Sequence, residues 1–210
     1  MGYLLENPRV ILALLGQHLV MTFVALALAA LIALPLGTLA ARRPGLRGPL
    51  FSVLGIIYTI PSLALFVLLI PVMGLGLVPA ITALVAYAQV ILVRNVTVGL
   101  LGVDPGVLEA ARGMGMTAWQ RFHRVELPLA LPVILAGVRV AVLAIIGIGT
   151  IAAFINAGGL GVLLFTGVSQ SFPDKIVAGS IAASALALAS NRLLRGLEHR
   201  ALIRARGETA

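Results

Sequence analysis

The hydrophobic positions of the chain form long runs that charged side chains rarely interrupt. From Val10 to Ala41 the one ionisable side chain is His18, and residues 48–93 contain no charged side chain at all. An apolar stretch of about 18 residues or more is long enough to cross a bilayer as a helix. The pattern therefore predicts transmembrane helices rather than the amphipathic elements of a soluble domain.

The run of residues 48–93 is too long for one crossing, because a helix of about 20 residues already spans the bilayer core. Residues that often interrupt helices cluster in its middle: Pro71, Gly74, Gly76 and Pro79. We therefore divide this run into two helices. The complete pattern predicts an all-α polytopic protein with one transmembrane domain, residues 1–210, and five spans at 18–41, 50–72, 76–93, 129–154 and 176–194.

Basic residues alternate between successive connections, and this alternation sets the expected orientation. The first and third connections and the C-terminal tail are rich in arginine, whereas the N-terminal segment has only Arg9 and the fourth connection only Lys175. The second connection has no basic residue. Because Lys and Arg accumulate on the cytoplasmic side of membrane proteins, we expect the N-terminus outside and the C-terminus inside.

Composition agrees with a membrane protein. The chain is 60% hydrophobic and 10% charged, with a mean hydropathy of +1.12, whereas soluble domains carry about 25% charged residues. The net charge of +8 would suggest nucleic acid in a soluble protein, but here the arginines lie between apolar runs, so we expect no nucleic-acid partner. Cysteine is absent, and no His or acidic pair has metal-ligand spacing, so we expect neither a catalytic residue nor a metal site.

The third connection differs from the others because it is long and carries both apolar residues and both signs of charge. Its pattern predicts two short amphipathic helices separated near Gly113 and Gly115. Asp104 followed by Pro105 is typical of a helix N-cap and first turn. Thr117 is a candidate cap for the second short helix.

A motif in residues 103–128 resembles the coupling signature of the membrane subunits of binding-protein-dependent ABC importers. That signature has the order E-A-A, three residues, G, nine residues, I, one residue, L-P. The matching positions here, with Val in place of Ile, are Glu109, Ala110, Ala111, Gly115, Val125, Leu127 and Pro128. The resemblance implies a type I ABC importer permease core in which residues 103–128, the coupling segment, transmit force from an ATPase.

The physical properties of these residues suit that role. Small side chains at Ala110 and Ala111 permit close approach of a partner, and Glu109 offers a carboxylate for a charge-assisted hydrogen bond. Gly115 permits a turn between the two short helices, and Pro128 is tolerated in the first turn of the next helix. The alternative for this segment is an amphipathic helix that lies on the membrane surface.

The resemblance covers nearly the whole chain and extends to the glycine betaine, carnitine and choline subgroup. The stretches that carry it are residues 32–37, 60–64, 103–105, 109–116 and 157–161. The sequence departs from the subgroup at Asn156, Val162 and Asn191. The resemblance implies two ABC ATPase subunits, an extracytoplasmic substrate-binding protein, a second permease copy or paralogue, and a bacterial or archaeal cell membrane. It also implies that ATP and Mg²⁺ bind to the ATPase partners, so this chain itself needs no cofactor and is not an enzyme.

Four polar or helix-breaking positions inside the spans are candidates for the translocation path. Pro61 lies midway through the second predicted span, beside Thr59 and Ser62, where a kink would free backbone carbonyls. Arg139 is a formal charge well inside a predicted span, whereas Arg192 lies two residues from the end of the last one. Packing alone would also explain Pro61, and Arg139 has three interpretations: a substrate contact, a dimer contact, or a side chain that extends toward the cytoplasmic surface.

Three other functions remain open at the level of sequence. A permease of the same superfamily could carry methionine, a sulfonate or ergothioneine. A secondary transporter would need no ATPase, but such carriers use intramembrane carboxylates and internal repeats, and every acidic residue here lies outside the predicted spans. A structural assembly factor would not require the coupling signature. The scarcity of aromatic residues, 5% of the chain, predicts that a separate protein supplies high affinity for a quaternary ammonium ion.

Overall fold

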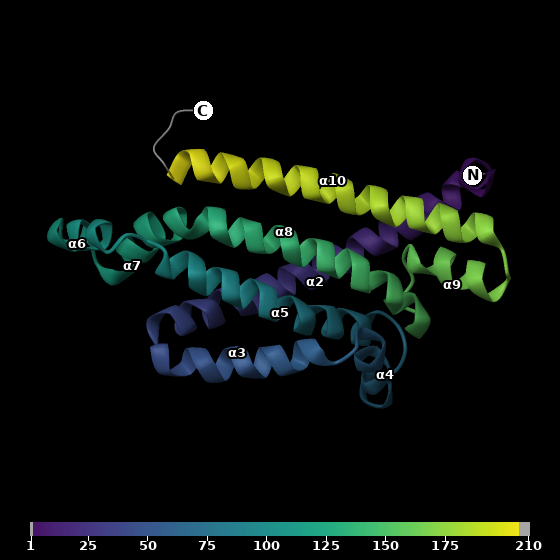
Figure 1. Ribbon diagram of the computed structural model, residues 1–210, viewed down its shortest axis with the longest axis horizontal. Coiled ribbons are helices and arrows are strands. Elements are labelled where there is room, and N and C mark those ends of the chain that lie inside the picture. The colour runs from purple at the N-terminus through teal and green to yellow at the C-terminus, as the bar shows by residue number, and fades with distance from the viewer. Residues whose placement is uncertain (1, 206–210) are drawn as a thin grey trace.

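The computed structural model describes residues 2–205, and within that range every regular element is helical (Figure 1). The helices are α1 (Gly2–Glu6), α2 (Pro8–Arg42), α3 (Pro44–Thr59), α4 (Ser62–Met73), α5 (Leu77–Leu101), α6 (Pro105–Gly113), α7 (Ala118–Arg121), the π-helical turn η1 (Phe122–Glu126), α8 (Leu127–Ile151), the 3₁₀ turn η2 (Ala152–Ile155), α9 (Gly161–Ser169) and α10 (Pro173–Ala205).

The long helices lie side by side along the long axis of the molecule, and the chain direction alternates in the order α2, α3, α5, α8 and α10 (Figure 1). Helix α5 is central, because it packs against α2, α3, α4 and α8. Helix α10 covers the other side of α8 and also contacts α9. Helix α1 and the last turns of α10 lie at opposite ends of the bundle, and α6 and α7 lie at the end where α10 finishes (Figure 1).

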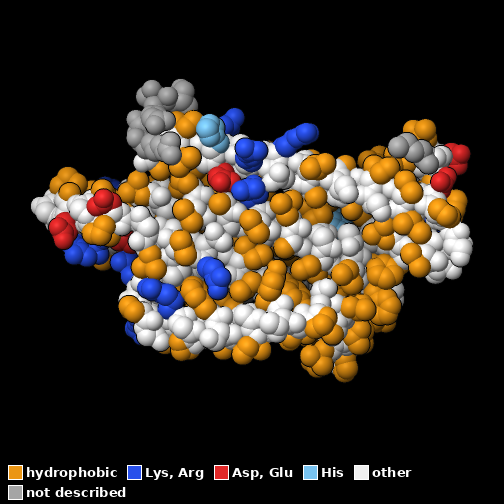
Figure 2. All heavy atoms as spheres, in the orientation of Figure 1, with side chains coloured by type: hydrophobic (Ala, Val, Ile, Leu, Met, Phe, Trp, Pro, Cys, Tyr) orange, Lys and Arg blue, Asp and Glu red, His pale blue; other side chains and the backbone are white. Residues whose placement is uncertain are grey.

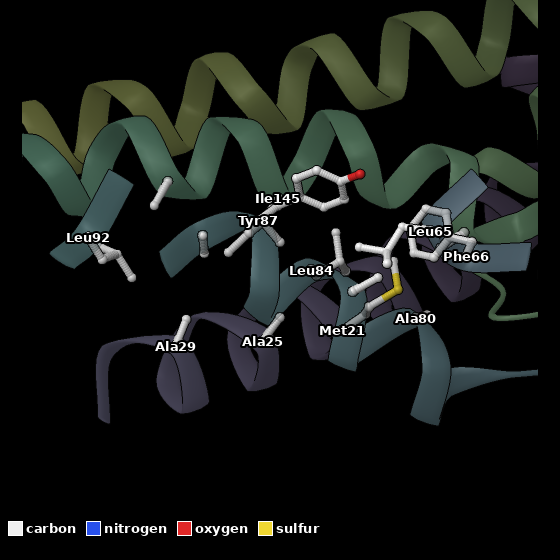
Figure 3. Packing of buried hydrophobic residues seen from close by; sticks show 14 of the residues in the cluster. Met21, Ala25, Ala29, Leu65, Phe66, Ala80, Leu84, Tyr87, Leu92 and Ile145 are labelled. Atoms are coloured by element: carbon white, nitrogen blue, oxygen red, sulfur yellow. The ribbon is translucent and has the colours of Figure 1, made fainter. Parts of the chain in front are cut away.

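The main core lies where α2, α4, α5 and α8 meet (Figure 3). Alanines such as Ala25 and Ala29 form the contact face of α2, and the larger Leu84 and Tyr87 of α5 lie opposite them. Small residues at helix contacts are typical of membrane bundles, because close backbone approach replaces the hydrophobic driving force that lipid does not supply. Gly37 of α2 shows this most clearly, since a Cβ atom there would lie 2.6 Å from Val96 of α5.

Among residues 2–205, four helices are long and apolar enough to cross a membrane: α2, α5, α8 together with α7 and its flanking turns, and α10. The bent pair α3–α4 would make a fifth span if counted as one. The all-helical expectation is thus confirmed, but the second predicted span, residues 50–72, is not one continuous helix. It divides into α3 and α4, whose axes differ by 94°.

Proline causes this break, and neighbouring side chains satisfy part of the backbone that it exposes. Pro61 cannot donate a backbone hydrogen bond, and Ile60 before it takes an extended conformation with ψ 127°. The Tyr87 hydroxyl donates to the Ile60 carbonyl, and Thr59 Oγ1 donates to the Ile56 carbonyl at 2.7 Å. Irregular backbone at membrane depth is tolerated where protein groups pair with it in this way.

The helices also extend past the predicted spans, because hydropathy marks the part of a helix that lipid surrounds and not its ends. Helix α2 begins at Pro8 rather than near residue 18, and α10 continues to Ala205 rather than ending near residue 194. Helix α9 was not predicted at all, since a helix of nine residues is too short for a span.

The glycine-rich turn before α9 is anchored to α2 rather than free. Gly158 and Gly159 have φ values of 79° and 78°, which favour glycine. The Gly159 N–H donates to Gln17 Oε1 at 3.0 Å, and the Leu160 N–H donates to His18 Nδ1 at 3.4 Å.

Candidate functional site

The two short helices of the coupling segment form at one end of the bundle, as the sequence predicted (Figure 1). Asp104 is the N-cap of α6, and its carboxylate accepts a hydrogen bond from the Gly106 N–H at 2.6 Å. Thr117 caps α7 in a capping box, in which its hydroxyl accepts from the Gln120 N–H and the Gln120 side chain accepts from the Thr117 N–H. Such caps stabilise helices that are too short to form alone.

Gly115 makes the turn between the two helices. Its φ of +77° lies in the left-handed region, which side chains with a Cβ atom rarely adopt. The Gly115 N–H donates to the Arg112 carbonyl at 2.9 Å, and the Met116 N–H donates to the Ala111 carbonyl at 3.2 Å. These bonds close the end of α6 and direct the chain back toward α8.

The outer surface of the coupling segment has the chemistry of a docking site. Ala111 is buried, whereas Glu109 and Ala110 are exposed. The Glu109 carboxylate forms no hydrogen bond or ion pair with any residue among 2–205, so it is available to a partner. Met114 and Trp119 are each 71% exposed, and large apolar side chains exposed together mark interaction sites.

The coupling segment continues into α8 without a break in the helical backbone. The π turn η1 carries Val125, and the Leu127 N–H bonds to the Phe122 carbonyl five residues earlier. Pro128 follows directly in the first turn of α8, where its missing N–H is tolerated. A rotation of α7 would therefore reach α8 through a continuous helix.

The sequence prediction missed Glu126, which joins the coupling segment to α2. Its side chain lies between two arginines: Arg42 Nη2 approaches Oε2 at 2.5 Å and Arg121 Nε approaches Oε1 at 3.1 Å. Glu126 is only 4% exposed. The chain has only seven acidic residues, and an acid inside the signature at the edge of a predicted span was a signal that could have identified it.

The path candidates do not lie together in the structure. Thr59, Pro61 and Ser62 surround the α3–α4 break beside α5. Arg139 instead points toward α10, where its Nε donates to Glu198 Oε2 at 2.9 Å and its Nη1 donates to Asn191 Oδ1 at 3.3 Å. Within residues 2–205, no group of three or more His, Cys, Asp or Glu side chains could hold a metal ion.

Residues 33–203 match the family described as "Binding-protein-dependent transport system inner membrane component". The chain belongs to this family, and it is therefore a multi-pass membrane protein and a transport subunit rather than a catalyst.

Known relatives are similar over nearly the full length. The osmoprotectant import permease protein OsmW of Salmonella typhimurium is 43% identical over 93% of this chain and 94% of its own. The glycine betaine/carnitine/choline transport system permease protein OpuCB of Bacillus subtilis is 36% identical, and the match covers 95% of this chain and 92% of that protein.

Solved structures share the fold. An inward-facing form of the MetNI methionine ABC transporter is 27% identical, with a TM-score of 0.74 over 90% of this chain and 98% of that chain. An amino acid ABC transporter solved with histidines has a TM-score of 0.75 at 20% identity, covering 94% of this chain and 96% of that one, and it supports the fold alone.

Proposed function

We propose that this chain is the membrane subunit of an ATP-driven importer for osmoprotectants such as glycine betaine, carnitine or choline. The observation that carries the proposal is the coupling signature folded as a helix–turn–helix at one end of the bundle. The substrate class rests on relatives that are 36–43% identical and named for these solutes. A methionine importer is the second candidate, and the fold shared with a methionine transporter supports it less, because the identity is lower.

The coupling segment is the proposed contact for the ATPase subunits. Exposed Met114 and Trp119 offer apolar anchors, and Glu109 on the same segment offers a carboxylate that has no partner among residues 2–205. A soluble partner with a groove and a basic residue would fit this combination. ATP and Mg²⁺ would bind to that partner, and a second permease, identical or paralogous, would complete the pathway.

The proposed orientation has five passes, with the N-terminus outside, in the cell membrane of a bacterium. Its support is that α1 and the last turns of α10 lie at opposite ends of the bundle (Figure 1), which an odd number of passes requires. On the face shown in Figure 2, basic side chains gather over the half that carries α6, α7 and the end of α10. This half is the expected cytoplasmic half.

The α3–α4 break is the proposed part of the translocation path that this chain supplies. Thr59 and Ser62 bring hydroxyl groups to a place where the backbone is irregular, and Tyr58 packs edge-on against Tyr87 at 5.8 Å between ring centroids. Arg139 has a different proposed role, because Glu198 and Asn191 already bind its guanidinium. The Arg139 side chain links α8 to α10 through these hydrogen bonds.

Uptake by the reconstituted importer tests the substrate class. Proteoliposomes that contain this chain and its ATPase are expected to accumulate labelled glycine betaine only when ATP is inside and the cognate binding protein is outside. We expect choline or carnitine to compete and methionine not to compete. The isolated chain should bind these solutes only in the millimolar range, about −4 kcal/mol, because only 5% of its residues are aromatic and could hold a quaternary ammonium ion.

Calorimetric titration of the purified chain tests whether the separate binding protein, and not this chain, supplies high affinity for the solute. Micromolar binding of glycine betaine by the chain alone would contradict it and would move specificity to the α3–α4 break. Competition by methionine, but not by choline or carnitine, would overturn the osmoprotectant assignment while leaving the importer class intact.

A further inference from the structure

A groove of about 750 Å³ lies between the start of α8 and the end of α10, apart from the surface of Met114 and Trp119. Its lining combines arginines with aliphatic side chains and contains no acidic residue. The residues that line it are Arg124, Val125, Pro128, Leu129, Leu131, Leu135, Leu197, Arg200, Ala201, Arg204 and Ala205. Nothing in the coupling role accounts for this combination.

Charge and apolar character are segregated along the groove. Helices α8 and α10 run antiparallel, so the start of α8 lies beside the end of α10. Arg124 precedes α8, and Arg200 and Arg204 lie in the last turns of α10, so the three guanidinium groups belong to the outer end. Leu131 and Leu135, farther along α8, line the part that lies toward the middle of the bilayer.

The three arginines also have no partner within residues 2–205. The ion pairs of the described chain involve Arg42, Arg121 and Arg139, whereas Arg124, Arg200 and Arg204 form none. Arg200 and Arg204 are four residues apart and so share one face of α10. Like charges held near one another without an acid favour the binding of an anion.

We propose that this groove binds an anionic phospholipid, with the phosphate at Arg124, Arg200 and Arg204 and an acyl chain along Leu131, Leu135 and Leu197. Basic pockets between transmembrane helices at the membrane surface suit such headgroups. The separation of the arginines from the leucines along the groove favours a lipid over a soluble ATPase or free phosphate. A soluble ATPase has no acyl chain to cover Leu131, Leu135 and Leu197, and free phosphate would leave these leucines exposed.

Native mass spectrometry of the full-length chain in detergent tests the proposal, with dioleoyl phosphatidylglycerol as the probe and dioleoyl phosphatidylcholine as the neutral comparator. We expect wild-type protein to retain phosphatidylglycerol selectively. Each basic residue near an anionic lipid contributes about fivefold in affinity. Arg200→Gln/Arg204→Gln should therefore weaken retention about 30-fold.

The matched control is Arg192→Gln/Arg195→Gln, which removes the same charge from exposed positions of the same helix outside the groove. We expect it to retain phosphatidylglycerol as the wild type does. Equal losses in both variants would indicate nonspecific attraction and overturn the proposal. So would displacement of the lipid by millimolar inorganic phosphate, or a groove variant that keeps its lipid but no longer dimerises, which would assign the groove to a second copy.

Discussion

Glu109→Lys is expected to abolish stimulation of the ATPase while the protein still inserts in the membrane. The Glu109 side chain is exposed and unpaired among the described residues, so its replacement should not disturb the bundle. Loss of a charge-assisted hydrogen bond costs about 1.5–3 kcal/mol, and the lysine adds repulsion against a basic partner. We expect at least about a tenfold loss of substrate-stimulated ATP hydrolysis in proteoliposomes.

Glu6→Lys is the matched control, because Glu6 is an exposed glutamate at the opposite end of the molecule. It makes the same change of charge without touching the coupling segment. Wild-type transport by the Glu109 variant would show that this carboxylate does not bind the ATPase. Equal loss in both variants would attribute the effect to net charge.

Glu126→Gln is expected to damage both stability and transport. The substitution keeps the shape of the side chain but removes the charge that neutralises Arg42 and Arg121. Breaking a buried ion pair typically costs about 3–5 kcal/mol, and we expect the lower end because the Arg42 side chain is 44% exposed. The midpoint of thermal unfolding in detergent should fall, and coupled transport should slow about tenfold or more.

Glu198→Gln provides the comparison, because it removes an ion pair of similar length from a more exposed place. A pair of that kind contributes about 1 kcal/mol or less. The Arg42→Gln/Glu126→Gln double variant should lose less than the sum of its single variants, since the two side chains form one interaction. Additive losses of stability in the double variant would contradict the interaction by which Glu126 connects α2 to the coupling segment. An unaltered melting midpoint for Glu126→Gln would contradict it as well.

The sequence predicted what depends on local chemistry. Long apolar runs identified the helices of the bundle, and Asp104 and Thr117 identified the caps of α6 and α7 because capping needs only a side chain and its near neighbours. Pro61 marked the place of the α3–α4 break, but a proline alone does not distinguish a mild kink from a bend of 94°. The hydrogen bond to the carbonyl at the bend comes from Tyr87, which is 27 residues after Ile60 in the sequence.

The features that the sequence could not supply depend on distant partners. Glu126 is an ordinary acid until Arg42, 84 residues away, is placed beside it. Arg139 had three open interpretations until Glu198, 59 residues away, was found to pair with it. Nothing near Gly158 and Gly159 in the sequence indicates that the Gly159 N–H donates a hydrogen bond to Gln17, 142 residues away.

Photo-cross-linking in intact cells tests most directly whether the coupling segment docks on an ATPase. The cross-linking amino acid p-benzoylphenylalanine would replace Met114, which is exposed on the coupling segment, or Phe172. Phe172 directly precedes α10, and the start of α10 lies at the end of the bundle opposite α6 and α7 (Figure 1). The account predicts an adduct with an ABC ATPase, identified by mass spectrometry, from position 114 and none from position 172. An ATPase adduct from position 172 alone, or no ATPase adduct from position 114, would contradict it.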